Sequence, residues 1–320
     1  MSEFDIIQRY FTRKTNSDPG LMLGIGDDAA ILHVPEGMEL AVSVDTLVQG
    51  VHFPATTAPA DIGYKALAVN LSDMAAMGAE PRWATLALTL PEADEHWLKN
   101  FSTGFFELAD RHGVQLIGGD TTHGPLAITI QIHGLVPAGS ALRRSGARVG
   151  DLIYVTGCVG DAGLALQALQ KKATLSPDHL AQVMTRLNRP EPRIKEGIAL
   201  RGIASAAIDI SDGLAADLSH ILAASGVGAT LCLEDLPLSP ALASVLSEVG
   251  GWNVPLASGD DYELCFTVPQ EHQALLLDAI EQFSCPCTCI GVTESIPGLR
   301  CRLANGELFE PARTGYQHFV

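Results

Sequence analysis

The sequence predicts an α/β protein of two domains, each a mixed sheet covered by helices. The chain has 320 residues, more than the roughly 100 to 200 that are typical of one domain. In both halves, short apolar segments with a two-residue period alternate with longer helical segments. A stretch rich in Gly, Ser and Arg separates the two series. We therefore predict an N-terminal domain over 1–137, a linker over 138–150 and a C-terminal domain over 151–320.

The first half contains four predicted strands and two predicted helices. In the first strand, Val42 and Val44 alternate with Ser43 and Asp45, so the two pairs lie on opposite faces. The first helix follows a Pro and ends near Gly78. The strands are expected at 39–45, 84–90, 114–117 and 127–135, and the helices at 61–79 and 95–112.

The second half repeats the alternation and predicts a second α/β unit. Its strands are expected at 152–156, 206–210, 229–233, 263–268 and 288–292. Its helices are expected at 161–171, 177–187, 193–201, 213–224 and 270–283. The pattern indicates layers of helix and sheet but leaves the order of the strands open.

Charge excludes several functions. The chain has 37 acidic and 20 basic residues, a formal charge of −17 and a pI near 4.8. Such a protein repels nucleic acid and anionic membrane surfaces, so we expect neither as a partner. If it binds phosphates, an Arg or Lys cluster or divalent metal ions must reverse the local charge.

Three features indicate a cytoplasmic protein without a membrane span. The N-terminus lacks a basic segment followed by an apolar one, as a signal peptide would have. The longest uncharged stretch, 121–142, alternates apolar and polar residues as a strand does. Seven cysteines without a short disulfide framework suit a reducing compartment. Cys285, Cys287 and Cys289 are interpreted as reduced structural thiols, because their spacing is not that of a zinc site.

Two common nucleotide motifs are absent or unsuitable. No P-loop sequence occurs, and none of the six lysines lies in a glycine loop. The segment from Gly24 to Ala29 superficially fits a dinucleotide fingerprint, but Pro35 follows too soon for the helix that this motif requires. The adjacent Asp27 and Asp28 would also repel a pyrophosphate unless metal ions stood between them.

A set of aspartates at strand ends or beside small residues remains. Ser43 and Asp45 share a strand face, and Asp120 and Asp209 are expected to follow or end apolar strands, where loops project ligands. Asp73 lies in an otherwise uncharged helical stretch, where a carboxylate needs a partner. Each aspartate alone is equally well explained as a turn former, helix cap or surface group. The members of the set are Asp28, Asp45, Asp73, Asp120, Asp209 and Asp212.

The set as a whole favours magnesium. Hard carboxylate oxygens suit Mg²⁺, which binds one or two carboxylates together with substrate phosphates and waters. Several such ions could neutralise ATP and a phosphorylated acceptor together. The residues alone therefore predict a phosphotransferase site built on several magnesium ions.

The order of the motifs resembles that of a known family. They are GIGDDAA, VDTLVQGVHF, KALAVNLSDMAAMGAEP, LIGGDTT, RSGARVGD, YVTG, IDISDGL, SGDDYEL and GYQHF. They span nearly the whole chain and are similar to those of the thiamine-monophosphate kinases, in the superfamily of aminoimidazole ribonucleotide synthetase and selenophosphate synthetase. The resemblance implies the two-domain fold of that superfamily, a homodimer, several Mg²⁺ ions, and transfer of phosphate from ATP to thiamine monophosphate. That transfer is the last step in making thiamine diphosphate.

The resemblance also implies roles for individual residues. Some relatives have Glu where this chain has Asp260, which is one methylene shorter. The implied metal ligands are Asp28, Ser43, Asp45, Asp73, Asp120, Asp209 and Asp212, with Val44 contributing a backbone carbonyl. The implied nucleotide contacts are Gly119, Asp120, Arg144 and Ser211, and the implied thiamine monophosphate contacts are His52, Asp260 and Tyr316.

Physical chemistry leaves alternatives for several of these residues. Arg144 offers a planar fork for phosphate oxygens, but Arg143 could serve instead. His52, in a loop after a strand, could nearly as well be a structural or surface histidine, and Tyr316 could simply pack the C-terminus. An aromatic ring and a carboxylate together nevertheless suit the cationic thiamine. The glycines from Gly157 to Gly163 join a strand to a helix, where they could offer N–H groups to phosphate or merely permit a tight turn.

The expected mechanism is direct in-line phosphoryl transfer without a general base. The acceptor is a phosphate monoester, whose second pKa of about 6 leaves it largely anionic near neutral pH. Rival functions are another ATP-using enzyme of the same superfamily or a non-catalytic acidic scaffold. Selenophosphate synthetase is disfavoured because the first cysteine is Cys158, far from the N-terminal segment.

Overall fold

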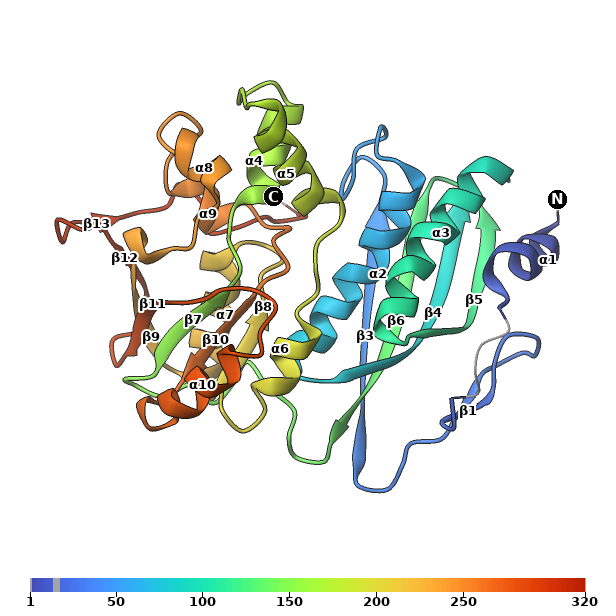
Figure 1. Cartoon of the computed structure of the whole chain (residues 1–320), viewed down its shortest axis with the longest axis horizontal. Helices are drawn as coiled ribbons and strands as arrows, with labels where there is room; N and C mark the ends of the chain where they lie inside the picture. The colour runs from blue at the N-terminus through green and yellow to red at the C-terminus, as the bar shows by residue number, and fades with distance from the viewer. Residues whose placement is uncertain (1, 14–17, 320) are drawn as a thin grey trace. The chain divides into compact units, whose positions relative to one another are not determined.

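The computed structural model describes residues 2–13 and 18–319, which form two compact units. Unit 1 comprises Met1–Met74 and Ala79–Gly139, and unit 2 comprises Ala75–Gly78 and Ser140–Val320. Each unit is a mixed β-sheet with helices packed on it (Figure 1). The predicted α/β class is therefore confirmed.

The sheet of unit 1 has four strands in the order β3-β6-β4-β5. They span Met38–Val48 (β3), Glu80–Leu90 (β4), Gln115–His123 (β5) and Ala127–Pro137 (β6). β6 pairs antiparallel with both β3 and β4, whereas β5 runs parallel to β4. β3 is an edge strand, and it is longer than the segment 39–45 that the sequence predicts.

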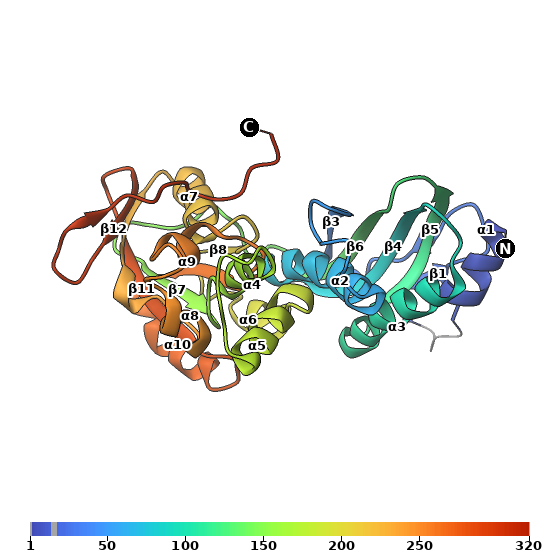
Figure 2. The ribbon, with the colours of Figure 1, turned by 90° about the horizontal axis from the view of Figure 1, so that it is seen from above.

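Two helices, α2 (Pro59–Ala76) and α3 (Glu95–His112), cover one face of this sheet (Figures 1 and 2). α3 begins where the Asp94 carboxylate accepts two backbone N–H groups and ends at Gly113 in the left-handed conformation. α2 and α3 cross so closely that only glycine fits at two positions. A Cβ on Gly63 would overlap the Phe101 carbonyl, and one on Gly104 would overlap the Ala60 carbonyl. Small residues at the crossing thus set how tightly this layer packs.

The N-terminal segment forms short elements that the sequence pattern did not predict. They are α1 (Glu3–Ile6), a π-helical turn η1 (Ile7–Phe11) and the strands β1 (Leu21–Leu23) and β2 (Ile31–Leu32). Leu21 and Leu32 of the β1–β2 pair pack against Trp83, Ile117 and Leu135 of the sheet. β2 is only two residues long, which is too short to produce a periodic signal.

Unit 2 contains a seven-stranded sheet in the order β13-β12-β9-β11-β7-β10-β8. Only the β12·β9 pair is parallel. The strands are β7 (Leu152–Thr156), β8 (Ala206–Asp209), β9 (Gly228–Cys232), β10 (Leu264–Val268), β11 (Cys287–Glu294), β12 (Gly298–Arg302) and β13 (Leu308–Phe309). Every predicted strand of this half is found, and β12 and β13 are additional.

The helices of unit 2 connect these strands and pack on the sheet. They are α4 (Asp161–Leu169), α5 (Pro177–Asn188), α6 (Ile194–Ala199), α7 (Leu214–Ser225), α8 (Pro240–Val245), α9 (Asn253–Ala257) and α10 (Gln273–Ile280), with short 3-10 turns η2 (Leu233–Asp235) and η3 (Gln270–His272). One core includes Ile153, Ile208, Leu218 and Leu231 from four different elements. α8 and α9 were not predicted.

One strand boundary bears on function. The sequence predicts a strand over 114–117 with Asp120 in a following loop, but β5 continues from Gln115 to His123 and contains Asp120. The placement of Asp120 after a strand is therefore wrong; pairing with β4 carries the strand through the glycines.

Within the described residues, no helix is both long and apolar enough to cross a membrane.

Candidate functional site

In unit 1, β3 and α2 bring two carboxylates and a hydroxyl together. The Ser43 hydroxyl donates a short hydrogen bond to the Asp73 carboxylate. Burial raises the pKa of the Asp45 carboxyl to about 6, and the negative charge of Asp73 raises it as a second cause. The strand and helix therefore hold two acidic groups near each other in a partly buried place, where each opposes the ionisation of the other.

This donor set fits a hard cation. Two carboxylates and a hydroxyl are oxygen ligands of the kind that Mg²⁺ prefers, and a divalent ion would relieve the repulsion between Asp45 and Asp73. Val44 directs its side chain to the opposite, exposed face, so only its carbonyl suits such a role. In the described part of the chain, no group of three or more His, Cys, Asp and Glu side chains is placed to hold a metal ion. A metal ion here would therefore also need hydroxyl, carbonyl, water or substrate oxygens.

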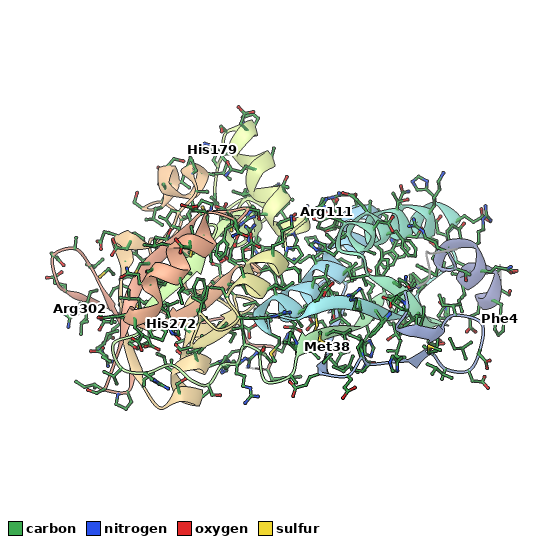
Figure 3. All side chains as sticks on the ribbon, turned by 60° about the horizontal axis from the view of Figure 1, so that its bottom comes forward. Phe4, Met38, Arg111, His179, His272 and Arg302 are labelled. Carbon is green, nitrogen blue, oxygen red and sulfur yellow. The ribbon has the colours of Figure 1, made fainter. Side chains whose placement is uncertain are left out.

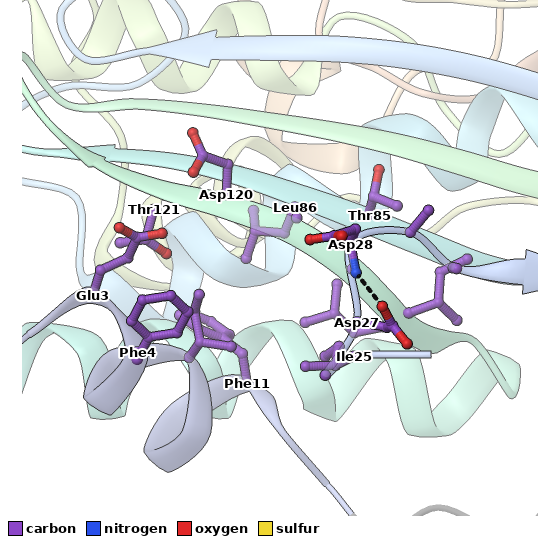
Figure 4. A pocket seen from close by; sticks show the side chains of 18 residues that line it. Glu3, Phe4, Phe11, Ile25, Asp27, Asp28, Thr85, Leu86, Asp120 and Thr121 are labelled. Atoms are coloured by element: carbon purple, nitrogen blue, oxygen red, sulfur yellow. Dashed lines mark hydrogen bonds between the residues drawn. The ribbon is translucent and has the colours of Figure 1, made fainter. Parts of the chain in front are cut away.

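A cavity of about 700 Å³ in unit 1 is lined by Asp28, Gly119 and Asp120 (Figure 4). Asp28 reaches it from the loop before β2, where the Asp28 N–H donates to Asp27 at 2.9 Å. A Cβ on Gly119 would overlap the carbonyl of Leu86, so only glycine lets β5 approach β4 here. Ser43, Asp45 and Asp73 do not line this cavity.

Two aromatic rings that also line the cavity were missed from the sequence, and the Glu3 carboxylate lies beside one of them (Figure 4). Phe4 and Phe11 reach the cavity from α1 and η1, and Leu86 reaches it from β4 (Figure 4). The Phe4 side chain is 78% exposed and lies at the periphery of unit 1 (Figure 3). No motif marked either Phe, because the elements that carry them are only four and five residues long.

The His52 ring stabilises its own loop. Its Nδ1 accepts the Val48 N–H at 3.0 Å, and the Lys65 ammonium donates to the His52 carbonyl at 3.5 Å. One ring nitrogen is thus committed to the turn that follows β3. The contact is the structural role considered for His52. A contact between its Nε2 atom and thiamine monophosphate stays a prediction.

In unit 2, Asp209 ends β8 as the sequence predicts, and the following loop is organised by a residue that the sequence pattern did not mark. Asp217, in the first turn of α7, accepts the backbone N–H groups of Ser211, Asp212 and Gly213 at 3.0, 3.0 and 3.1 Å. Burial raises the pKa of Asp217 to about 7, although these hydrogen bonds act in the opposite direction. Asp217 therefore shapes the loop that presents Asp212.

The same loop gathers two further predicted residues. The Asp260 N–H donates to the Ser211 carbonyl at 2.8 Å, and the Tyr316 N–H donates to the Asp212 carbonyl at 2.9 Å. Tyr316 is 45% exposed, and its ring packs edge-on against His318, so its role in binding stays a prediction. Unit 2 thus places Asp209, Ser211, Asp212, Asp260 and Tyr316 around one loop.

Arg143 and Arg144 remain equivalent candidates. Both side chains are exposed. Their carbonyls accept hydrogen bonds, from the Ala207 N–H at 2.9 Å for Arg143 and from the Ser225 hydroxyl at 3.2 Å for Arg144. These contacts fix the backbone of the pair and favour neither guanidinium for phosphate.

The glycine loop before α4 is not a phosphate cradle. The N–H groups of Gly157 and Val159 donate to backbone carbonyls of Pro286 and Pro237 at 2.8 and 3.0 Å. The Gly160 N–H donates to the buried Asp261 carboxylate. The phosphate hypothesis is therefore wrong for these three donors, because the protein itself satisfies them.

The C-x-C-x-C run lies in β11 and the residues before it. Burial raises the pKa of Cys285 and of Cys287 to about 12, so both are thiols at neutral pH. All seven cysteines are free in the structure. These properties agree with the structural interpretation.

Two family models define the class. The model of the AIR synthase related protein, N-terminal domain, matches residues 26–136, and that of its C-terminal domain matches residues 148–303. Together they cover well over half of the chain. The fold is thus that of the AIR synthase related proteins, as the resemblance implied.

Individual relatives narrow the class. The thiamine-monophosphate kinase of Escherichia coli strain K12 is 50% identical over 320 residues, which are 99% of this chain and 98% of that protein. The crystal structure of thiamine-monophosphate kinase from Stenotrophomonas maltophilia K279a has a TM-score of 0.83 at 47% identity, covering 91% of this chain and 93% of that one. AaThiL complexed with AMPPCP and TMP has a TM-score of 0.77 at 32% identity, covering 90% and 89%. This chain belongs to the thiamine-monophosphate kinase family.

Proposed function

We propose that this protein transfers the γ-phosphoryl group of ATP to thiamine monophosphate, giving thiamine diphosphate and ADP. The observation that carries the proposal is the full-length match at 50% identity, with the predicted acidic residues concentrated around two loci in unit 1 and one loop in unit 2. The solved complex of a relative with AMPPCP and TMP supports both substrates.

The cavity in unit 1 is the proposed nucleotide site. Its lining includes two aromatic rings, Phe4 and Phe11, and several carboxylates, among them Asp28 and Asp120. An aromatic base suits the rings, because aromatic rings stack on one another. Phosphates suit the carboxylates only with cations between the charges, so ATP is proposed to enter as its magnesium complex. Arg144 and Ser211, in unit 2, stay predicted nucleotide contacts that the resemblance to the family implies.

Magnesium is proposed as the metal at these acidic residues. The proposed ligands are Asp28, Ser43, the Val44 carbonyl, Asp45, Asp73, Asp120, Asp209 and Asp212. The support is their chemistry: all are hard oxygen donors, and the pKa of Asp45 is raised by burial and by a second carboxylate. When bound, magnesium would shield the two anionic substrates from each other.

His52, Asp260 and Tyr316 are proposed to bind thiamine monophosphate. A carboxylate offers charge to the cationic thiazolium, and an aromatic face attracts the same cation. No side chain is proposed as a general base, because the acceptor phosphate is already largely ionised near pH 7. The protein's part in an in-line transfer is then alignment and charge neutralisation.

The decisive experiment measures ADP and thiamine diphosphate formation from Mg-ATP with thiamine monophosphate, with thiamine and with no acceptor. The proposal predicts product only with the monophosphate, and only while Mg²⁺ is present. ADP without an acceptor would favour another enzyme of the superfamily, and no ADP in any mixture would favour a scaffold. Asp120→Ala and Asp209→Ala should each abolish turnover without unfolding the protein; near-normal activity in both would refute the metal scheme.

A homodimer through β3 is also proposed. This edge strand carries Leu40, Val42 and Val44 on an exposed face, at 39%, 49% and 59% exposure. A long edge strand with an uncovered apolar face is prone to aggregation unless something covers it. A second copy of the chain is the proposed cover, because closed two-fold dimers are the commonest oligomers. Light scattering should show a dimer, and Val42→Lys should give a monomer. A wild-type monomer at micromolar concentration would refute this assembly.

We further propose a cytoplasmic location, which the free cysteines support.

A further inference from the structure

Residues 260–263, in the motif SGDDYEL, adopt an unusual backbone. Asp260 and Tyr262 have φ angles of 64° and 51°, in the left-handed region. Asp tolerates this region, but a bulky residue such as Tyr rarely enters it. Such conformations persist only where the surroundings impose them, and they concentrate at functional sites.

The backbone is tied to the loop after β8. The Asp260 N–H donates to the Ser211 carbonyl, and the Tyr262 N–H donates to the Ile210 carbonyl, each at 2.8 Å. The Ile210 N–H returns a hydrogen bond to the Glu263 carbonyl at 2.8 Å. The strained residues are therefore fixed to the loop that carries the proposed ligands of unit 2.

Side chains alternate between the interior and the surface along this segment. Glu263 is buried, and its carboxylate accepts from Arg193 Nε at 2.6 Å and Nη2 at 2.5 Å, from Thr156 Oγ1 at 2.7 Å and from Arg186 Nη2. A carboxylate held by two guanidinium groups and a hydroxyl has little freedom. Glu263 is thus a rigid anchor at one end of the segment.

Asp261 is the second buried anchor. Both of its oxygens accept the Gly160 N–H, at 3.0 and 2.9 Å, at the N-terminus of α4. At Gly157, a Cβ would overlap the Glu263 carboxylate. The glycine loop before α4 therefore wraps around the two acidic anchors of the segment, which gives its glycines a structural reason.

On the outer side of the segment, Tyr262 contacts Asp260, which is proposed to bind thiamine monophosphate. Its hydroxyl donates to Asp260 Oδ1 at 2.9 Å. Both side chains are partly exposed, whereas Asp261 and Glu263 are buried. The hydrogen bond fixes the orientation of the Asp260 carboxylate, and it depends on the left-handed conformations that the anchors impose.

From this geometry we propose that Tyr262 is a positioning residue for Asp260 in binding thiamine monophosphate. The Arg186–Glu263–Arg193 cluster and the Gly160–Asp261 contact hold Tyr262 in the conformation that makes this possible. A carboxylate oriented before binding loses less entropy when it meets the cationic thiamine. This inference rests on the proposed function and on the assignment of Asp260 to that substrate.

The test is steady-state kinetics on Tyr262→Phe, which removes only the hydroxyl. We expect the KM for thiamine monophosphate to rise about tenfold, the change typical of losing one hydrogen bond to a charged group. The KM for ATP and the melting temperature should stay close to wild type. A purely structural tyrosine would instead lower the melting temperature or the active fraction and leave both KM values unchanged.

A double-mutant cycle makes the test specific. Asp260→Gly removes the carboxylate while suiting the left-handed backbone. In that background Tyr262→Phe should have no further effect on the KM for thiamine monophosphate, because the two residues act as one unit. Full additivity of the two effects would overturn the proposal.

A matched pair of variants tests the anchor. Glu263→Gln keeps the shape but removes the charge that pairs with two arginines, and it should raise the KM for thiamine monophosphate more than that for ATP. Glu294→Gln is the control, because Glu294 likewise accepts from a threonine, Thr230 at 2.7 Å, and an arginine, Arg300 at 2.5 Å. Its KM values should match wild type. Equal effects of both variants on the KM for thiamine monophosphate would overturn the anchoring role.

Failure of this inference differs from failure of the proposed function. If the wild-type protein makes no thiamine diphosphate, the function itself is wrong. If wild type is active and Asp260→Gly raises the KM for thiamine monophosphate, but Tyr262→Phe does not, then only the positioning role is wrong. If Asp260→Gly also leaves that KM unchanged, the assignment of Asp260 is refuted and the inference with it.

Discussion

Two carboxylate sites in this molecule solve the same electrostatic problem differently. In unit 2, Glu263 is buried against Arg186, Arg193 and Thr156, so the protein supplies the compensating charge. In unit 1, the charged group that perturbs Asp45 is another acid, Asp73. The first arrangement is complete without a ligand. For the second we propose a cation from solution, through which an acidic protein can bind phosphates.

The pKa shifts of Arg193 in unit 2 and of Asp45 in unit 1 reflect this difference. Burial lowers the pKa of Arg193, but the hydrogen bonds and charge of Glu263 outweigh it, and the net pKa lies above the ordinary value. For Asp45, burial and the neighbouring charge act together to raise the pKa to about 6. The arginine is thus held charged, whereas burial and the neighbouring charge disfavour the ionised form of Asp45.

The largest expected effect is on activity in the unit 1 site. Asp45→Asn keeps the shape but removes a proposed ligand charge, and we expect kcat/KM to fall by at least about 100-fold, as for loss of a key contact at a metal site. Stability without Mg²⁺ should not fall, because a repelled carboxylate is removed. Urea unfolding in EDTA checks this. A variant that loses stability in proportion to activity would show that Asp45 is mainly structural.

The next effect is on stability in unit 2. Glu263→Leu leaves the buried Arg193 and the partly buried Arg186 without their shared partner and should reduce the free energy of unfolding by about 3 to 5 kcal/mol. The control Glu294→Leu removes a more exposed pair and should cost only about 1 kcal/mol or less. Urea denaturation of both variants measures the difference. Equal losses would remove the distinction between a structural carboxylate and a surface one.

A smaller effect is expected at the aromatic lining of the proposed nucleotide cavity. Phe4→Ala should raise the KM for ATP about three- to tenfold, the range for loss of one aromatic contact. Stability should hardly change, because Phe4 is 78% exposed. Phe319→Ala is a matched control, since its ring is 96% exposed and does not line this cavity. An unchanged KM for ATP in Phe4→Ala would place the base elsewhere.

The sequence predicted those features that depend on local order. The two-residue period placed Ser43 and Asp45 on one face of β3, and the apolar run 206–210 placed Asp209 at the end of β8. The order of the motifs along the chain then identified the family, because many fixed segments in one order are far more specific than any single motif.

What the sequence did not predict depends on contacts between distant residues. The Gly160 N–H meets Asp261, 101 residues later, and Glu263 meets Thr156, 107 residues earlier. No local pattern distinguishes such a glycine loop from a phosphate cradle. Asp217 was missed because its role, holding three N–H groups, follows from the turn into α7. The exposed apolar face of β3 also reverses the usual expectation that valines face the core.

The central claim is that the Asp45–Asp73 pair of unit 1, which we propose as metal ligands, binds a divalent cation. Its most direct test is a magnesium titration of the melting temperature for wild type and Asp45→Asn, without nucleotide. Wild type should rise in melting temperature as Mg²⁺ saturates the site, since a ligand that binds only the folded state stabilises it. Asp45→Asn should begin at or above the wild-type value in EDTA and respond little. A wild-type melting temperature that ignores Mg²⁺, or an equal rise in both proteins, would contradict the account.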